Sequence, residues 1–325
     1  MKRAILICVA LTGLAALAEG LVLMRVSIDP WRLAALLENL ALLLGVFVGL
    51  SHSATVKLLR HWAQKSAWLA VAIPFLLLIP YLIYALGTHT FSLIALGKLC
   101  AYIAVPTVLL LPDRLHHAER VGWRDLAAML ALGLPVAANW LDGIWTWPQE
   151  LYLFRPLFCV CVGGYAFMAV RNLDGVGYRL LWRKADVTDG LANLAAFALI
   201  GIPLGIALGF LHPHAGEATV GKFLLQFVGV YLTVAIPEEF LFRGILQNFL
   251  VRSIHRGPRG LYGLLIASLV FGLSHLHHAP VPNWRYAVLA TLAGIFYGNA
   301  YRTRRRLSSC ALTHALVDTL WHFWF

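Results

Sequence analysis

An acidic pair followed by an arginine lies inside an apolar stretch at residues 235–244. This stretch contains Glu238, Glu239 and Arg243. Residues four apart share one face of a helix, so Glu239 and Arg243 are placed to form an ion pair. Glu238, one position away, has no such local cation and could take a proton from water as a general base. The alternative interpretation is a structural ion-pair cluster that holds helices together.

Two later segments add imidazole and carboxylate groups. His275 follows Phe271 by about one helical turn, and His314 and Asp318 are again four residues apart. A single histidine in an apolar helix is more often a hydrogen-bonded tie than a catalytic group. Three helices that each carry an acid or an imidazole are better explained by one shared site, because such groups are costly in a membrane.

The composition shows which elements must position these groups. The chain has 325 residues, of which 60% are hydrophobic and 13% charged, and its mean hydropathy is +0.76. Soluble domains carry roughly 25% charged residues, so this chain lacks the polar surface that a water-soluble globule needs. The sequence therefore predicts an all-α, polytopic integral membrane helix bundle in a lipid bilayer. The five cysteines follow neither a zinc-site spacing nor a disulfide framework.

Apolar runs long enough to cross a bilayer recur along the chain and predict about eleven transmembrane helices. They lie near residues 4–24, 33–51, 66–87, 91–111, 124–139, 151–170, 188–211, 221–250, 261–280, 285–300 and 307–325. The connections between them are too short for a soluble domain. The first run, which follows Lys2 and Arg3, also fits a cleaved signal peptide.

The distribution of lysine and arginine predicts the orientation. Every second loop is basic, as in the loop with Arg179, Arg183 and Lys184, and the intervening loops carry few positive charges. By the positive-inside rule the N-terminus is cytoplasmic and the C-terminus outside, in a plasma (inner) membrane. The net charge of +11 is then a topology signal, and we expect no nucleic-acid partner.

The chain divides near residue 187. Residues 1–187 contain about six predicted spans with few ionisable groups at membrane depth, and the sequence assigns them no role. Residues 188–325 contain all three motifs and form the predicted catalytic domain.

The order and spacing of the motifs resemble the CAAX-protease and bacteriocin-processing family of intramembrane peptidases, which includes the Rce1-type prenyl-protein endopeptidases. The resemblance covers about residues 188–325, and the segment 294–314 also looks like the family's link between its last two motifs. Asp318 stands where many members have asparagine. The matching positions are Glu238-Glu239-x-x-x-Arg243, Phe271-x-x-x-His275 and His314-x-x-x-Asp318.

The resemblance implies a glutamate-dependent intramembrane endopeptidase that acts on a membrane-anchored protein or peptide, near the C-terminus of that substrate. It implies that Glu238, assisted by His275, activates a water molecule that attacks the scissile carbonyl. His314 and Asp318 would orient groups or stabilise the oxyanion, and Glu239 and Arg243 would support the geometry. This scheme needs no cofactor.

Four alternatives remain open from the sequence. A zinc ion held by Glu238, His275 and His314 would suit these residue types, although no His-Glu-x-x-His motif is present. A serine peptidase would use Ser274, but residues adjacent on a helix point about 100° apart and should not pair. A polytopic transporter or a noncatalytic membrane scaffold would also bury a cluster of glutamate, arginine and histidine.

Overall fold

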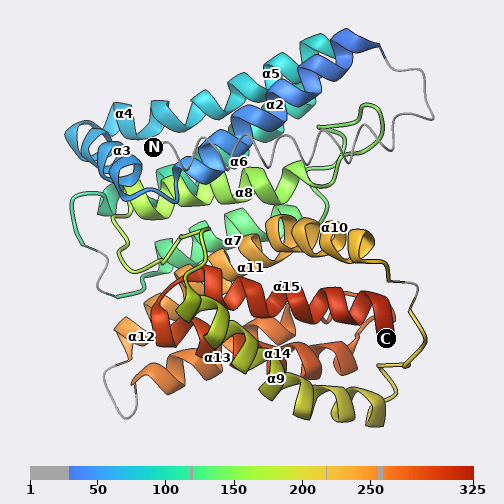
Figure 1. Cartoon of the computed structure of the whole chain (residues 1–325). Coiled ribbons are helices and arrows are strands. Elements are labelled where there is room, and N and C mark those ends of the chain that lie inside the picture. Colours follow the sequence, from blue (N-terminus) through green and yellow to red (C-terminus); the bar gives the residue numbers. More distant parts are fainter. Residues whose placement is uncertain (1–28, 118–119, 217, 255–258) are drawn as a thin grey trace. The chain divides into compact units, whose positions relative to one another are not determined.

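The structure is a computed structural model that describes residues 29–117, 120–216, 218–254 and 259–325 (Figure 1). All regular elements in this part of the chain are helices, which confirms the predicted all-α class. The predicted span 4–24, with the alternative of a signal peptide, lies outside the described residues. The chain divides into two compact units, residues 1–118 with 122–174 and residues 119–121 with 175–325. The roles assigned to residues 1–187 and 188–325 remain predictions.

The first unit is a bundle of helices whose buried core contains a cluster of aromatic side chains. Trp145 stacks on Phe154 at 5.5 Å between ring centroids, and both side chains are fully buried. Its elements are α2 Pro30–Gly49, α3 Ser53–Lys65, α4 Ala67–Ala72, η1 Ile73–Leu77, α5 Leu78–Gly87, α6 Leu93–Leu110, η2 Leu111–Asp113, α7 Trp123–Ala137, α8 Phe154–Gly164 and η3 Tyr165–Val170.

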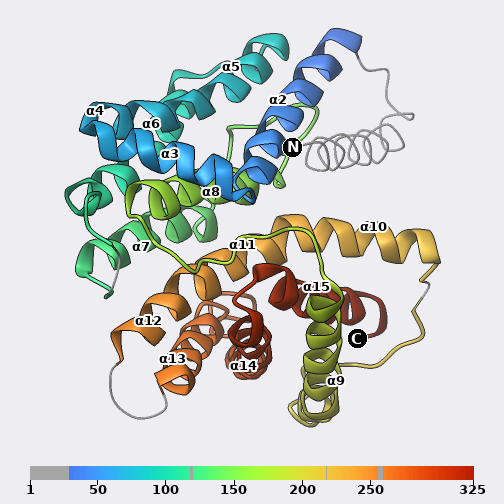
Figure 2. The same ribbon diagram turned by 60° about the vertical axis from the view of Figure 1, so that its left-hand side comes forward.

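The second unit contains all the predicted site residues. Figure 2 shows α10, α11 and α12 as one long helical run beside α13, α14 and α15, and α14 packs against α9, α13 and α15. Its elements are α9 Lys184–Ala207, α10 Val220–Val230, η4 Tyr231–Ala235, α11 Ile236–Glu239, η5 Phe240–Gln247, α12 Asn248–Ser253, α13 Arg259–Leu273, α14 Trp284–Arg304 and α15 Leu307–Trp324.

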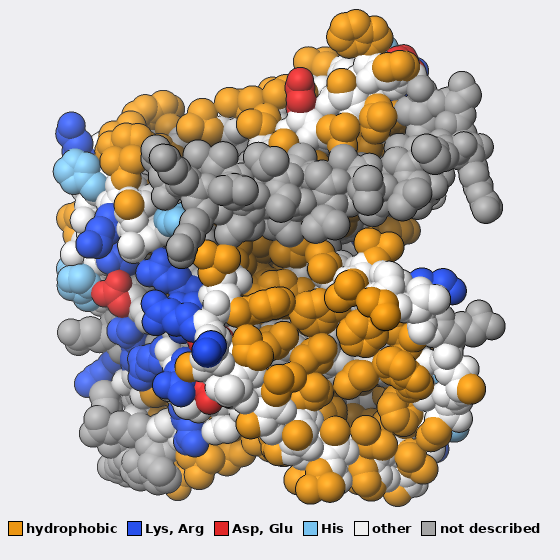
Figure 3. Space-filling model, in the orientation of Figure 1, with side chains coloured by type: hydrophobic (Ala, Val, Ile, Leu, Met, Phe, Trp, Pro, Cys, Tyr) orange, Lys and Arg blue, Asp and Glu red, His pale blue; other side chains and the backbone are white. Residues whose placement is uncertain are grey.

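Helices occupy every predicted span within the described residues, and α3 is an additional helix between two of them. Five helical stretches are long and apolar enough to cross a membrane: Pro30–Gly49, Ala67–Gly87, Leu93–Asp113, Lys184–Ala207 and Val220–Ser253. The total of about eleven spans stays a prediction. Within the second unit, lysine and arginine side chains gather at the left of the view, beside a broad hydrophobic face (Figure 3).

One buried carboxylate fixes the starts of α9 and α15. Asp186 is 1% exposed and caps α9 by accepting a hydrogen bond from the backbone N–H of Arg183 at 2.9 Å. The same carboxylate accepts from Arg306 Nε at 2.9 Å and from the Ser308 hydroxyl at 3.1 Å. Asp186 thereby ties the beginning of α15, the helix of His314 and Asp318, to α9.

Asp186→Ala should lower the free energy of unfolding by about 3–5 kcal/mol, because it leaves a partly buried guanidinium without its partner. Asp189→Ala is the matched control. Asp189 lies one turn later on α9, and its partner Arg304 is 45% exposed. This exposed pair should contribute about 0–1 kcal/mol. Equilibrium unfolding in detergent micelles measures both variants, and equal losses would contradict this account.

Candidate active site

The segment with the two glutamates is an irregular part of a long helix. α11 is a single α-helical turn, and π-helical segments η4 and η5 lie on either side of it. Pro237 stands in this turn and has no N–H to donate to the backbone of the preceding turn. π-Helical turns are rare and are frequent at functional sites. The local sequence thus favours a widened helix where Glu238 and Glu239 project.

Glu239 and Arg243 form the buried ion pair that their spacing predicts. Both side chains are 0% exposed, and Arg243 Nη1 donates to Glu239 Oε1 at 3.0 Å. Arg243 Nη2 donates to the backbone oxygen of Gly294 at 3.1 Å. The guanidinium also lies over the Phe271 ring, 4.4 Å from its centroid. Each of these contacts stabilises a cation that would be costly in an apolar interior.

Two glycines on α14 make room for this pair. A Cβ atom at Gly294 would lie 3.1 Å from Arg243 Nη2, and one at Gly298 would lie 2.6 Å from Gln247 Oε1. One turn after the arginine, Gln247 Nε2 donates to the backbone oxygen of Gly298 at 3.0 Å. Because both positions lack a side chain, η5 approaches α14 closely enough for its polar groups to reach the α14 backbone.

His314 is the central residue of the site, because its ring nitrogens face three carboxyl groups. Its Nδ1 lies 2.8 Å from Glu239 Oε1, so Nδ1–H donates to that carboxylate. Its Nε2 faces Asp318 Oδ2 at 3.5 Å and Glu238 Oε2 at 3.8 Å. The imidazole stacks on Tyr297, with ring centroids 4.6 Å apart and an interplanar angle of 15°. The structure therefore brings the first and third sequence motifs together around one imidazole.

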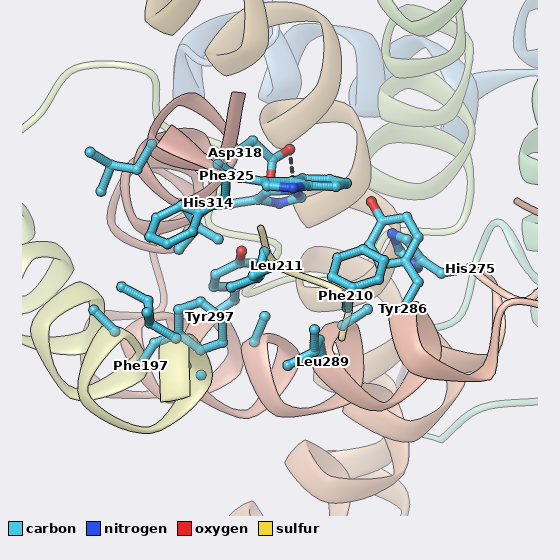
Figure 4. A pocket seen from close by; sticks show the side chains of 18 of the residues that line it. Phe197, Phe210, Leu211, His275, Tyr286, Leu289, Tyr297, His314, Asp318 and Phe325 are labelled. Atoms are coloured by element: carbon cyan, nitrogen blue, oxygen red, sulfur yellow. Dashed lines mark ion pairs between the residues drawn. The ribbon is translucent and has the colours of Figure 1, made fainter. Parts of the chain in front are cut away.

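Glu238 and Asp318 differ from Glu239 in exposure. The Glu238 side chain is 34% exposed and that of Asp318 27% exposed, whereas Glu239 is fully buried. Glu238 and Asp318 line a cavity of about 230 Å³, shown in Figure 4. Much of its wall is apolar or aromatic and comes from α9, the segment that follows α9, α14 and α15. These wall residues include Phe197, Ile202, Phe210, Leu211, Leu289 and Trp321.

His275 lines the same cavity but forms no ion pair with a described carboxylate. It was expected within a helical span, but α13 ends at Leu273, and His275 lies in the following turn. Its Nδ1 is 2.8 Å from the backbone oxygen of Phe271, which only accepts. The hydrogen is therefore on Nδ1, and Nε2 is left as an acceptor. Figure 4 shows His275 beside Tyr286, across the cavity from His314 and Asp318.

The structure places Ser274 closer to His275 than the sequence argument predicted. Ser274 Oγ lies 3.3 Å from His275 Nδ1, since both residues are in a turn and not in a regular helix. The expectation that they should not pair was therefore wrong. However, this Nδ1 carries the hydrogen, and the serine hydroxyl donates to the Phe271 backbone oxygen at 2.7 Å. The imidazole is not oriented to take a proton from Ser274.

Sequence reasoning missed two tyrosines at the site. Tyr297 stacks on His314, and Tyr286 makes an edge-to-face contact with His275, with centroids 4.6 Å apart. Tyr297 falls within the segment 294–314 that resembles the family's linking segment, which could have identified it. Tyr286 has no such signal, because its role depends on where the turn after α13 places His275.

The geometry of the described residues does not support the zinc alternative with a cluster of ligands. In the part of the chain that the structure describes, no group of three or more His, Cys, Asp and Glu side chains is arranged to hold a metal ion. Glu238 and His314 come together, but His275 remains apart from them. Metal dependence is therefore a question for experiment.

Residues 220–320 match the family model of Rce1-like type II CAAX prenyl endopeptidases. The match confirms the resemblance predicted from the three motifs, and the matched range contains all six predicted site residues. It supports, in general terms, a membrane-embedded protease that hydrolyses a protein substrate. No curated protein and no solved structure matches the chain.

Glu239→Gln should destabilise the protein far more than Glu238→Gln. The first change leaves Arg243 and His314 without their shared anion in a closed interior, which typically costs about 3–5 kcal/mol. The second affects a partly exposed carboxylate whose nearest nitrogen is 3.8 Å away. Thermal unfolding of the two variants in the same detergent measures the difference. If both lose the same stability, Glu238 belongs to the structural cluster.

Proposed function

We propose that the chain is an intramembrane endopeptidase that cleaves a membrane-associated protein or peptide near its C-terminus, with water activated by Glu238 and His275. The observation that carries the proposal is the contrast between two adjacent glutamates. Glu239 is closed off by two donors, whereas Glu238 opens into a largely apolar cavity and its buried Oε2 has no hydrogen-bond partner among the described residues. A carboxylate placed in this way suits a general base.

In the proposed reaction Glu238 takes a proton from water as the water oxygen attacks the scissile carbonyl carbon. The carbonyl electron pair moves to the oxygen, which becomes the oxyanion. When the tetrahedral intermediate collapses, the C–N bond breaks and the leaving amine receives a proton from Glu238. His275 Nε2, a hydrogen-bond acceptor on the cavity wall, would orient the water before attack.

The oxyanion is proposed to form on the side of His314 and Asp318. Glu239 holds His314 Nδ1, which fixes the ring so that Nε2 faces the cavity groups. Tyr297 limits tilting of the same ring by stacking on it. Donors fixed before the reaction stabilise a developing charge without reorganisation, and removal of one such donor typically costs about 100- to 1000-fold in rate.

The cavity wall also indicates the substrate class. Phe197, Phe210 and Leu289 surround the polar groups with apolar surface, which suits a hydrophobic or lipid-anchored segment that enters from the bilayer. We propose that the protein works in a plasma (inner) membrane with its basic loops and N-terminus cytoplasmic and its C-terminus outside.

Glu238→Gln should abolish cleavage, because the amide keeps the shape of the side chain but cannot take a proton from water. Mass spectrometry of C-terminal peptides in cells with and without the protein identifies a cleaved substrate, which is then incubated with purified protein. Glu38→Gln makes the same chemical change on the exposed side of α2 and serves as the control. If Glu238→Gln cleaves the substrate at a rate near that of the unchanged protein, Glu238 is not the general base.

Activity of the purified protein should survive exhaustive chelation, because the proposed scheme uses only side chains and water. The measurement is the cleavage rate before and after chelator is added and removed. Loss of activity that returns with one equivalent of zinc would replace this scheme with a metal-dependent one.

A further inference from the structure

His275 lies outside a regular helix, so its side chain needs support from other elements. α13 ends at Leu273 and α14 begins at Trp284, and His275 lies in the connection between them. It is 8% exposed, and its backbone N–H donates to the oxygen of Gly272 at 3.0 Å. A regular helix restricts the direction of a side chain more narrowly than a connection does. The contacts of the imidazole ring therefore decide where Nε2 points.

Two aromatic residues limit the position of this imidazole. Phe271 lies four residues earlier, with ring centroids 4.7 Å apart, and its backbone oxygen accepts from Nδ1–H of His275. Tyr286 lies beyond the connection, on α14, with its ring centroid 4.6 Å from that of His275 and an interplanar angle of 69°. Edge-to-face ring contacts at this distance are attractive and directional. Phe271 thus holds the imidazole from the preceding helix, and Tyr286 holds it from the following one.

Asn283 joins the connection to the first turn of α14. Its Oδ1 accepts from the backbone N–H of Tyr286 at 3.0 Å and thereby caps the helix. Its Nδ2 donates to the backbone oxygen of Ala279 at 3.1 Å, and its own N–H donates to the oxygen of Leu276 at 3.0 Å. The residue that caps α14 therefore also fixes the connection that carries His275 relative to Tyr286.

The Tyr286 ring is itself held by aromatic side chains. Phe210, from the segment after α9, and Trp321, from α15, have ring centroids 5.3 and 5.4 Å from that of Tyr286. Figure 4 shows Phe210, Tyr286 and His275 side by side. The Tyr286 hydroxyl forms no hydrogen bond with any of the described residues, so the ring makes the contacts of this side chain.

We propose that Tyr286 is the positioning residue of His275. Its ring, tied to the connection through Asn283 and held by Phe210 and Trp321, keeps the imidazole in the orientation in which Nε2 points to the cavity. This inference rests on the proposed function, in which His275 orients the attacking water. In that reaction Tyr286 touches neither the water nor the scissile bond, and it acts through the histidine.

Kinetics of two variants at position 286 test this role. Tyr286→Leu should lower kcat about 100-fold with a much smaller change in KM, because displacement of a positioned group by about 1 Å has an effect of that size. Tyr286→Phe should recover most of this loss, since it restores the ring without the hydroxyl. Tyr262→Leu changes an exposed tyrosine on α13 and is the control. The full-length protein in lipid nanodiscs is assayed with the substrate that mass spectrometry identifies. If Tyr286→Leu keeps its kcat, or Tyr286→Phe is as slow as Tyr286→Leu, the ring does not position His275.

Nitrogen NMR of protein with isotope-labelled histidine tests the position without reference to activity. The spectra are recorded at about pH 8, above the usual pKa of histidine, and His275→Gln identifies the signal of His275. The unchanged protein and Tyr286→Phe should show a single tautomer with the hydrogen on Nδ1. Tyr286→Leu should show a mixture that includes the Nε2–H tautomer, because the imidazole is free to leave the Phe271 oxygen. The same signal in all three proteins would overturn the positioning.

Asn283→Ala is a second variant that leaves every aromatic ring in place. It removes the cap of α14 and the hydrogen bond to Ala279, so the connection is no longer fixed relative to Tyr286. It should lower kcat and give the same mixture of His275 tautomers as Tyr286→Leu. An unchanged kcat and an unchanged His275 signal would contradict the tie through Asn283. A protein that shows the expected signals but cleaves nothing would refute the proposed function and leave the positioning intact.

Discussion

The rest of the second unit depends on the burial of Glu239. Its carboxylate accepts from Arg243 in η5 and from His314 in α15, and Arg243 in turn donates to the backbone of Gly294 in α14. An ionised group in an apolar interior is tolerated only when its partners lie within hydrogen-bond distance. The helices must therefore meet at one point, and this requirement specifies their packing more narrowly than apolar contacts, which are non-directional.

Several local sequence features serve this constraint. Glycine at 294 and 298 lets η5 approach α14, and Pro237 interrupts the regular bonding of the long helix where it carries the glutamates. Asp186 holds the starts of α9 and α15 together. The site is thus supported by backbone geometry at three separate positions, each of which follows from a residue type with an unusual backbone or charge.

The sequence predicted what depends on spacing along one helix and missed what depends on contacts between helices. The Glu239–Arg243 and His314–Asp318 pairs follow from a separation of four residues, and the helical class follows from composition. The central position of His314 does not, because it is set by how α15 crosses α11. The early end of α13 was also missed: an apolar sequence continues past Leu273, but the chain turns there and His275 faces the cavity. α3 was missed because its sequence is amphipathic and too polar to read as a span.

In the proposed function, the two adjacent glutamates have different roles: Glu239 stabilises the packing of the helices, and Glu238 takes part in the reaction. Adjacent residues project about 100° apart, so one carboxylate faces the helix interface and the other faces the cavity. The Glu239 carboxylate already accepts hydrogen bonds from Arg243 and His314, so it is not free to take a proton from water. The same donors orient His314 toward Glu238 and Asp318, so the closed carboxylate organises the open ones. A protease in a bilayer needs polar groups that water can reach while the helix bundle stays folded. Here Glu239 lies buried on the interior side of the charge cluster, and Glu238 and Asp318 are partly exposed on its other side.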